Sequence, residues 1–272
     1  MARASQIITE FLAFDAEHFG GMADSWTSIL KIAYPHLAQL HLSDILLALV
    51  DRTCMNRGTF QCGGLLDFIG FYGGVGNLSR ELLLRHLHGA IFNTMYRPVD
   101  HDCLGQGFRL WLDALCSTCE GALVWLGTQC SLFVALCASV SKGRLENQWM
   151  GDNGREFVQV GNCHMIITAL IYFLATLLQC ATCLEQPLNS CLPNCPLMAN
   201  AIKVNTHLGS FGAETPKPLQ IWTTCRELQD LWRPKPMNLP GTLVSKGPAK
   251  WNIHWIEGAL GSIWHLHPCI WS

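Results

Sequence analysis

An α/β fold is the class that this sequence predicts, with a doubly wound, Rossmann-like and mainly parallel sheet at its centre. The first observation is a regular alternation of short apolar runs and longer helix-like segments between residues 64 and 184. The second is a glycine-rich turn, GGVGN at 73–77, that stands between an apolar run and a helix-like segment. The third is composition: 50% of the 272 residues are apolar, so one large domain can bury a sizeable core.

The elements of this alternation follow one another in a regular order. Strands are expected near 65–72, 89–95, 122–127 and 180–184, and helices at 77–87, 107–118 and 157–178. The segments KVNTHLGSF (203–211) and KPLQIWTT (217–224) are separated by the turn-like GAETP. We expect these two segments to form an antiparallel pair at the edge of the sheet.

Three regions are predicted along the chain. Residues 1–55 read as a helical extension, because the apolar residues of SWTSILKIAYPHLAQLHLSDILLALV are spaced for a packing face. Residues 56–230 contain the alternation and form the main domain. Residues 231–272 are rich in proline, glycine and tryptophan without a usable period, which predicts an irregular or poorly ordered tail.

Charge and the first residues bear on partners and location. The formal net charge is −2, so a nucleic-acid interface would need a local basic groove. The opening MARASQIITEFLAFDAEHF carries acidic residues where a signal peptide has an apolar core. We therefore expect an intracellular protein, cytoplasmic or nuclear, and the sequence leaves its oligomeric state open.

Two long uncharged stretches, 121–141 and 163–184, keep a membrane protein with two spanning helices open as an alternative, because each is long enough to cross a bilayer. The first stretch has the polar run GTQCS (127–131) in its middle, and the second divides into a helix-like part and a short strand-like part. These features favour buried helices and parallel strands, which are apolar on both faces.

The 14 cysteines are expected to be mostly reduced, buried thiols in an intracellular protein. Two pairs have the spacing of zinc ligands, and two further cysteines extend the second pair. These residues are Cys116 with Cys119, and Cys180 with Cys183, Cys191 and Cys195. A core of free thiols without metal is the favoured interpretation, and a structural zinc on the second set stays open.

The glycine turn is the strongest chemical signal in the chain. A strand that reverses into a helix needs unusual backbone angles, and glycine also lets a ligand approach the backbone closely. The N-terminus of the following helix offers free N–H groups. The segment from 65 to 87 therefore predicts a loop that holds a nucleotide-like cofactor.

Five segments in order carry a resemblance to known proteins: YGGVGNLSREL, GALVWLGTQCS, SKGRLENQWMGD, CLEQPLNS and LGSFGAETPKPLQIW. Together they resemble a group of uncharacterised protist proteins and, more distantly, S-adenosylmethionine-dependent methyltransferases of the cytosine-5 type. The resemblance covers about 64–224. It implies a Rossmann-like sheet of seven strands, with the last two strands in an antiparallel hairpin, and S-adenosylmethionine as the cofactor.

The resemblance also implies residues for the cofactor. Gly74 and Gly76 match the glycine loop after the first strand, with Asn77 directly behind them. Asn93 stands where the family has an acidic residue for the cofactor ribose, because it follows the second strand. Asp102 is the remaining candidate for an acid on the cofactor side.

Two residues are implied for catalysis. Cys130 matches a cysteine that attacks a pyrimidine ring as a thiolate, and Glu185 matches a glutamate that bonds the edge of that ring. The implied substrate is a nucleobase, in nucleic acid or in a small molecule. A degenerate protein that keeps this architecture as a non-catalytic interaction module is the alternative within the same fold.

Overall fold

The computed structural model describes the central part of the chain. The described residues are 66–74, 76–105, 107–131, 133–134, 151–152, 154–192, 201–211 and 217–233. The predicted helical extension at 1–55 and nearly all of the predicted tail at 231–272 lie outside these residues.

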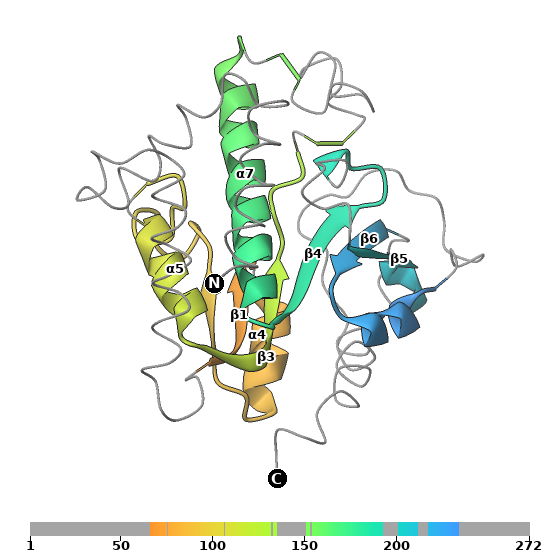
Figure 1. Cartoon of the computed structure of the whole chain (residues 1–272). Coiled ribbons are helices and arrows are strands. Elements are labelled where there is room, and N and C mark those ends of the chain that lie inside the picture. The colour runs from red at the N-terminus through yellow and green to blue at the C-terminus, as the bar shows by residue number, and fades with distance from the viewer. Residues whose placement is uncertain are drawn as a thin grey trace.

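A six-stranded, mostly parallel sheet with an antiparallel edge forms the centre of an α/β fold, as predicted at this level (Figure 1). The strands are β1 (Leu66–Phe71), β2 (Gly89–Phe92), β3 (Thr118–Leu126), β4 (Ala181–Pro187), β5 (Ile202–His207) and β6 (Pro218–Thr223). Their order across the sheet is β2-β1-β3-β4-β6-β5. Strands β1 to β4 pair in parallel, whereas β6 pairs antiparallel with both β4 and β5.

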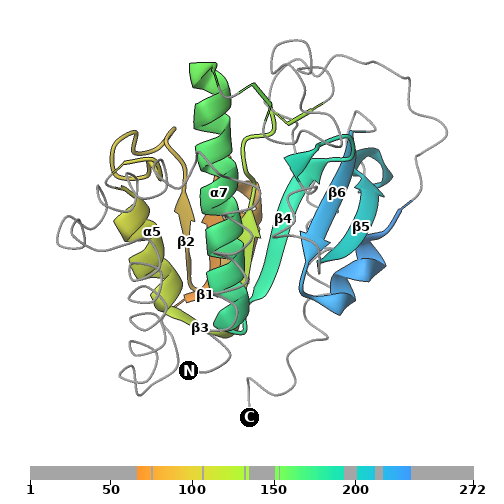
Figure 2. The ribbon, with the colours of Figure 1, turned by 45° about the horizontal axis from the view of Figure 1, so that its top comes forward.

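Helices pack against both faces of this sheet. They are α4 (Asn77–Leu84), α5 (Gly107–Cys116) and α7 (Glu156–Leu177), with the 3-10 turns η5 (Leu208–Phe211) and η6 (Arg226–Leu231). Figure 2 shows α5 and α7 in front of the strands. Their apolar residues form one core with the near face of the sheet, and α4 and η6 contribute to a second core on the far face.

The central strands β1 and β3 contribute apolar side chains to both cores, as strands between two helix layers must. In β3, Val124 and Leu126 belong to the core on the α7 side, whereas Leu123 and Trp125 belong to the opposite core. Since successive side chains of a strand point to opposite faces, this alternation follows from the run ALVWL itself. It explains why β3 lacks the polar alternation of a half-exposed strand.

Helix α7 is the one helix in the described part of the chain that is long and apolar enough to cross a bilayer, and 67% of its most apolar window is buried inside the protein. The membrane alternative required helices throughout 121–141 and 163–184. Residues 121–126 belong to strand β3 instead, and residues 181–184 begin strand β4. The helices that the membrane alternative needs are therefore not formed at 121–126 and 181–184.

Several predicted boundaries differ from the observed ones for reasons of hydrogen bonding. Strand β2 ends at Phe92 rather than at residue 95, because the Asn93 side chain accepts the N–H of Met95 at 2.8 Å and starts a turn. Strand β4 continues to Pro187, because it pairs with β6 that far. Residues 208–211 form a 3-10 turn where a strand was predicted.

The described cysteines are all free thiols. Cys180 belongs to the core on the α7 side, and Cys183 belongs to the core on the opposite face. The sheet therefore separates two of the four cysteines of the proposed zinc set, and Cys195 lies outside the described residues. Among the described residues, no group of three or more His, Cys, Asp or Glu side chains is arranged to hold a metal ion.

Candidate ligand-binding site

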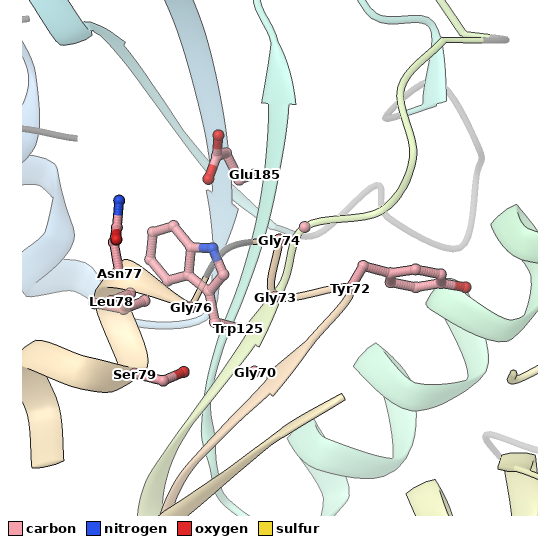
Figure 3. Close-up of a pocket in the computed structure, with 11 residues that line it drawn as sticks. Gly70, Tyr72, Gly73, Gly74, Gly76, Asn77, Leu78, Ser79, Trp125 and Glu185 are labelled. Atoms are coloured by element: carbon pink, nitrogen blue, oxygen red, sulfur yellow. The ribbon is translucent and has the colours of Figure 1, made fainter. Parts of the chain in front are cut away.

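A cavity of about 200 Å³ lies where the strand order of the sheet reverses. From β1 the chain passes to β2 on one side, and later returns to β3 on the other side. In open α/β sheets, ligands bind outside the carboxyl ends of the strands at such a point. The lining residues come from the ends of β1, β3 and β4 and from α4 (Figure 3): Gly70, Tyr72, Gly73, Gly74, Gly76, Asn77, Leu78, Ser79, Trp125, Gly127 and Glu185.

The glycine turn forms one wall of this cavity. Gly74 and Gly76 have φ angles of 55° and 73°, the left-handed region that favours glycine. Apart from the chain neighbours of Gly74, no atom of the described residues lies within 4 Å of the place where its side chain would begin, so the backbone there is open to a ligand. At Gly73 a Cβ atom would overlap the Ile91 side chain, so close packing explains the glycine there.

The N-terminus of α4 points at the same cavity without a cap. Its N-cap residue, Gly76, has no side chain to accept the first N–H groups, and the first turn contains no acidic residue. Ser79 is 6% exposed and lines the cavity. Free N–H groups and a hydroxyl together suit a ligand that offers oxygen acceptors.

Glu185 faces the glycine turn from β4. Burial raises the pKa of its carboxyl group, while Lys217 and the Trp125 indole N–H act in the opposite direction. The indole therefore holds the carboxyl group in place, and Figure 3 shows both side chains beside the glycine turn. The prediction placed Glu185 after the strand, whereas it lies inside β4, opposite Ile221 of β6.

The structure brings four predicted residues together: Gly74, Gly76, Asn77 and Glu185 all line this cavity. Asn93 and Asp102 have other contacts. The Asn93 amide donates to the Gly74 carbonyl oxygen at 3.3 Å and so supports the turn from outside the cavity. The Asp102 carboxylate accepts the Leu104 N–H at 3.0 Å in the loop before α5.

Cys130 is not among the described residues that line the cavity with Glu185. It follows β3 in the loop 127–131, and its neighbours Gln129 and Ser131 line a second cavity beside α7. Its role as a nucleophile, and the roles of Asn93 and Asp102 toward a cofactor, stay predictions.

Sequence reasoning did not single out Ser79 and Trp125. The sequence does contain an indication of each residue's position. Ser79 lies one helical turn after Gly76, so it is near the same end of the helix. Leu123 and Trp125 alternate with Val124 along β3, so their side chains share one face of the strand. Both positions follow once the glycine turn is placed at the N-terminus of a helix. The neighbouring strand then has to supply the opposite wall.

Tyr72 connects the glycine turn to the other side of the sheet. Its φ angle of 55° is rare for a bulky residue, and its side chain points away from the cavity (Figure 3). The hydroxyl lies 3.1 Å from His164 Nδ1 on α7 and 3.2 Å from Cys103 Sγ. Burial raises the pKa of the Tyr72 hydroxyl, raises that of the Cys103 thiol to about 12, and lowers that of the His164 imidazole. All three groups are therefore neutral at neutral pH.

Comparison with known proteins gives no further assignment. No family model matches the chain, and neither a curated protein nor a solved structure matches it. The function therefore has to be inferred from the residues that line the cavity.

Proposed function

We propose that this chain is an S-adenosylmethionine-dependent methyltransferase-like protein and that the cofactor binds in the cavity between the glycine turn and Glu185. The observation that carries the proposal is the position of this cavity at the reversal of strand order. A glycine turn, an uncapped helix N-terminus and a carboxyl group on the facing strand meet there.

The fold supports this proposal in two ways. The crossover helices α4 and α5 pack on opposite faces of the sheet, which favours a doubly wound, Rossmann-like arrangement. Strand β6 lies between β4 and β5 and pairs antiparallel with both, which agrees with the edge hairpin that the methyltransferase resemblance implies. The described sheet has six strands where the resemblance implies seven.

The chemistry of the lining residues also fits. The cofactor supplies an electrophilic methyl group on a sulfonium sulfur, and the protein has to bind and orient it. The free N–H groups of α4 and the Ser79 hydroxyl suit its carboxylate or hydroxyl oxygens, and the Glu185 carboxyl group suits its ammonium or hydroxyl donors. The open space at Gly74 allows close approach to the backbone.

A binding module without methyl transfer is the second candidate. It is favoured by the position of Cys130, which does not line the cavity, and by an amide at Asn93 where the resemblance implies an acid. Both candidates require the same cofactor cavity.

Isothermal titration calorimetry with S-adenosylmethionine and S-adenosylhomocysteine tests the proposal. We expect one site per chain with a dissociation constant on the order of 1–100 μM, which is about 5–8 kcal/mol. Heats that stay at the dilution level up to millimolar ligand would contradict the proposal.

A variant in the glycine turn locates the site. Gly74→Asn places a side chain in the open space beside the turn, and asparagine tolerates a positive φ better than most residues. We expect Gly74→Asn to weaken binding by about ten-fold or more, about 1.4 kcal/mol. Gly76→Val is a poorer test, because its Cβ would lie 2.9 Å from Ile91 and its φ of 73° would be strained, so the fold itself would suffer.

A further inference from the structure

Glu185 is the one acidic side chain among the described residues that line the cavity beside the glycine turn, and none of these residues is cationic. Tyr72 also lines the cavity, but its hydroxyl points away from it (Figure 3). A positively charged group of a ligand in this cavity therefore meets a carboxyl group and no like charge from the described lining residues.

The pairing of the strands holds Glu185 at a fixed place beside the cavity. Strand β4 pairs with β3 as far as Leu184, and its pairing with β6 continues beyond that point, with Glu185 opposite Ile221. Glu185 therefore follows the last residue that pairs with β3, while β6 still supports its backbone. The residue is partly exposed and lines the cavity, so a ligand can reach its carboxyl group.

Trp125 holds the direction of this carboxyl group. Trp125 pairs with Cys183, two residues before Glu185, so the side chains of Trp125 and Glu185 share one face of the sheet. Burial raises the pKa of Glu185, whereas Lys217, directly before β6, and the indole N–H of Trp125 favour the charged form. A ligand thus meets a carboxylate that a hydrogen bond has already oriented.

The two walls of the cavity have opposite polarity. The N-terminus of α4, which begins at Asn77, offers free N–H groups on one wall, and Glu185 offers a carboxylate on the other (Figure 3). A polyphosphate would bring further negative charge toward Glu185. S-adenosylmethionine instead combines oxygen acceptors with positive charge, and so it matches both walls.

The methyl donor and its product differ by one positive charge. During transfer, an electron pair of the acceptor forms a bond to the methyl carbon, the carbon–sulfur bond breaks, and its electron pair stays on sulfur. The cationic sulfonium thereby becomes the neutral thioether of S-adenosylhomocysteine. The ammonium, carboxylate and adenosine groups are the same in both molecules, so only the sulfonium can make a carboxylate distinguish them.

We propose that Glu185 is a specificity-determining residue that makes the cavity prefer the cationic methyl donor over the neutral product. This inference rests on the proposed function. Because two opposite charges attract each other more strongly in a partly buried site than in water, loss of the sulfonium charge removes a favourable interaction with Glu185. Methyl transfer itself then weakens the binding of the product, which favours its exchange for a new donor molecule.

Three ligands of nearly the same shape test this inference: S-adenosylmethionine, S-adenosylhomocysteine, and sinefungin, which carries an ammonium group in place of the sulfonium and has no methyl group to transfer. Isothermal titration calorimetry of the full chain gives the dissociation constant of each. We expect both cations to bind about ten-fold tighter than S-adenosylhomocysteine or more. In Glu185→Gln this ratio should fall to about two or less. Glu120→Gln, which alters an exposed carboxylate near the start of β3, should preserve it.

The ratio of affinities is insensitive to a general disturbance of the cavity, because such a disturbance weakens all three ligands alike. Equal affinities in the parent chain would overturn the inference and leave the proposed function standing. An unchanged ratio in Glu185→Gln would also overturn it, since Glu185 would then bind only groups that donor and product share. If none of the three ligands binds to the parent chain, the proposed function fails and this inference fails with it.

Discussion

Replacing Trp111 by alanine is expected to lower the free energy of unfolding by about 3–5 kcal/mol, the range for removing a fully buried aromatic side chain. Trp111 is 1% exposed, and the centroid of its ring lies 4.6 Å from the ring centroid of Phe71 and 4.9 Å from that of Tyr72. It supports the end of β1 directly before the glycine turn. Denaturant unfolding followed by circular dichroism measures the change.

Trp111→Phe is the control for this prediction. The indole N–H of Trp111 has no hydrogen-bond partner in the described part of the chain, so phenylalanine removes an unpaired buried donor while it keeps a ring in the cluster. We expect Trp111→Phe to cost less than half as much as alanine. A loss under about 1 kcal/mol for Trp111→Ala would contradict the role of this ring cluster in the core.

Replacing Glu185 by glutamine is expected to weaken cofactor binding and to stabilise the free protein. A hydrogen bond to a charged group contributes about 1.5–3 kcal/mol, so affinity for S-adenosylmethionine should fall by roughly 10–100-fold. Burial raises the pKa of Glu185 above its ordinary value, so its charged form is unfavourable in the folded state. Glutamine removes that charge, and the melting temperature at pH 7 should rise by roughly 1–4 °C.

The stability gained by Glu185→Gln is expected to increase with pH. Because the folded pKa of Glu185 is raised, the folded state holds its proton to higher pH than the unfolded state does. Stability is lost as pH rises through this window, and the penalty is absent below the unfolded value. The advantage of Glu185→Gln should therefore shrink as pH falls toward 4. Thermal unfolding from pH 4 to 8 measures this change, with Glu120→Gln as the exposed control. An equal effect of both substitutions would count against a raised pKa of Glu185.

Local sequence patterns were sufficient for the sheet and for one wall of the cavity. The apolar runs that became β1, β3 and β4 lie between two helix layers, so both of their faces are apolar, and the alternation with helix-like segments favoured strands over the spanning helices of the membrane alternative. The glycine turn was equally clear, because Gly74 and Gly76 do adopt the positive φ angles for which glycine is needed.

Pairing between distant segments was not visible in the sequence. Glu185 was expected in a loop, but β6 extends the pairing of β4 as far as Pro187, and this places Glu185 on a rigid strand. Asn93 was expected to face a cofactor because it follows β2, and this role stays a prediction. The hydrogen bonds of its side chain to Met95 and Gly74 depend on the geometry of the turn and could not be read from the sequence.

The hydrogen bonds of Tyr72 could not be anticipated either. They join residues separated by 31 and 92 positions, and they orient His164 on a helix whose apolar sequence suggested only packing. The second cavity, beside α7, could therefore be recognised only from the position of the loop after β3 relative to α7.

A crystal structure of the full chain with S-adenosylhomocysteine tests the central claim most directly. We expect the ligand to lie between the glycine turn at Gly73–Gly76 and the Glu185 side chain, with the oxygen atoms of the ligand at the N-terminus of α4 and at Ser79. A ligand bound elsewhere, or crystals grown at saturating ligand whose cavity holds only solvent, would contradict the assignment of this cavity as a cofactor site.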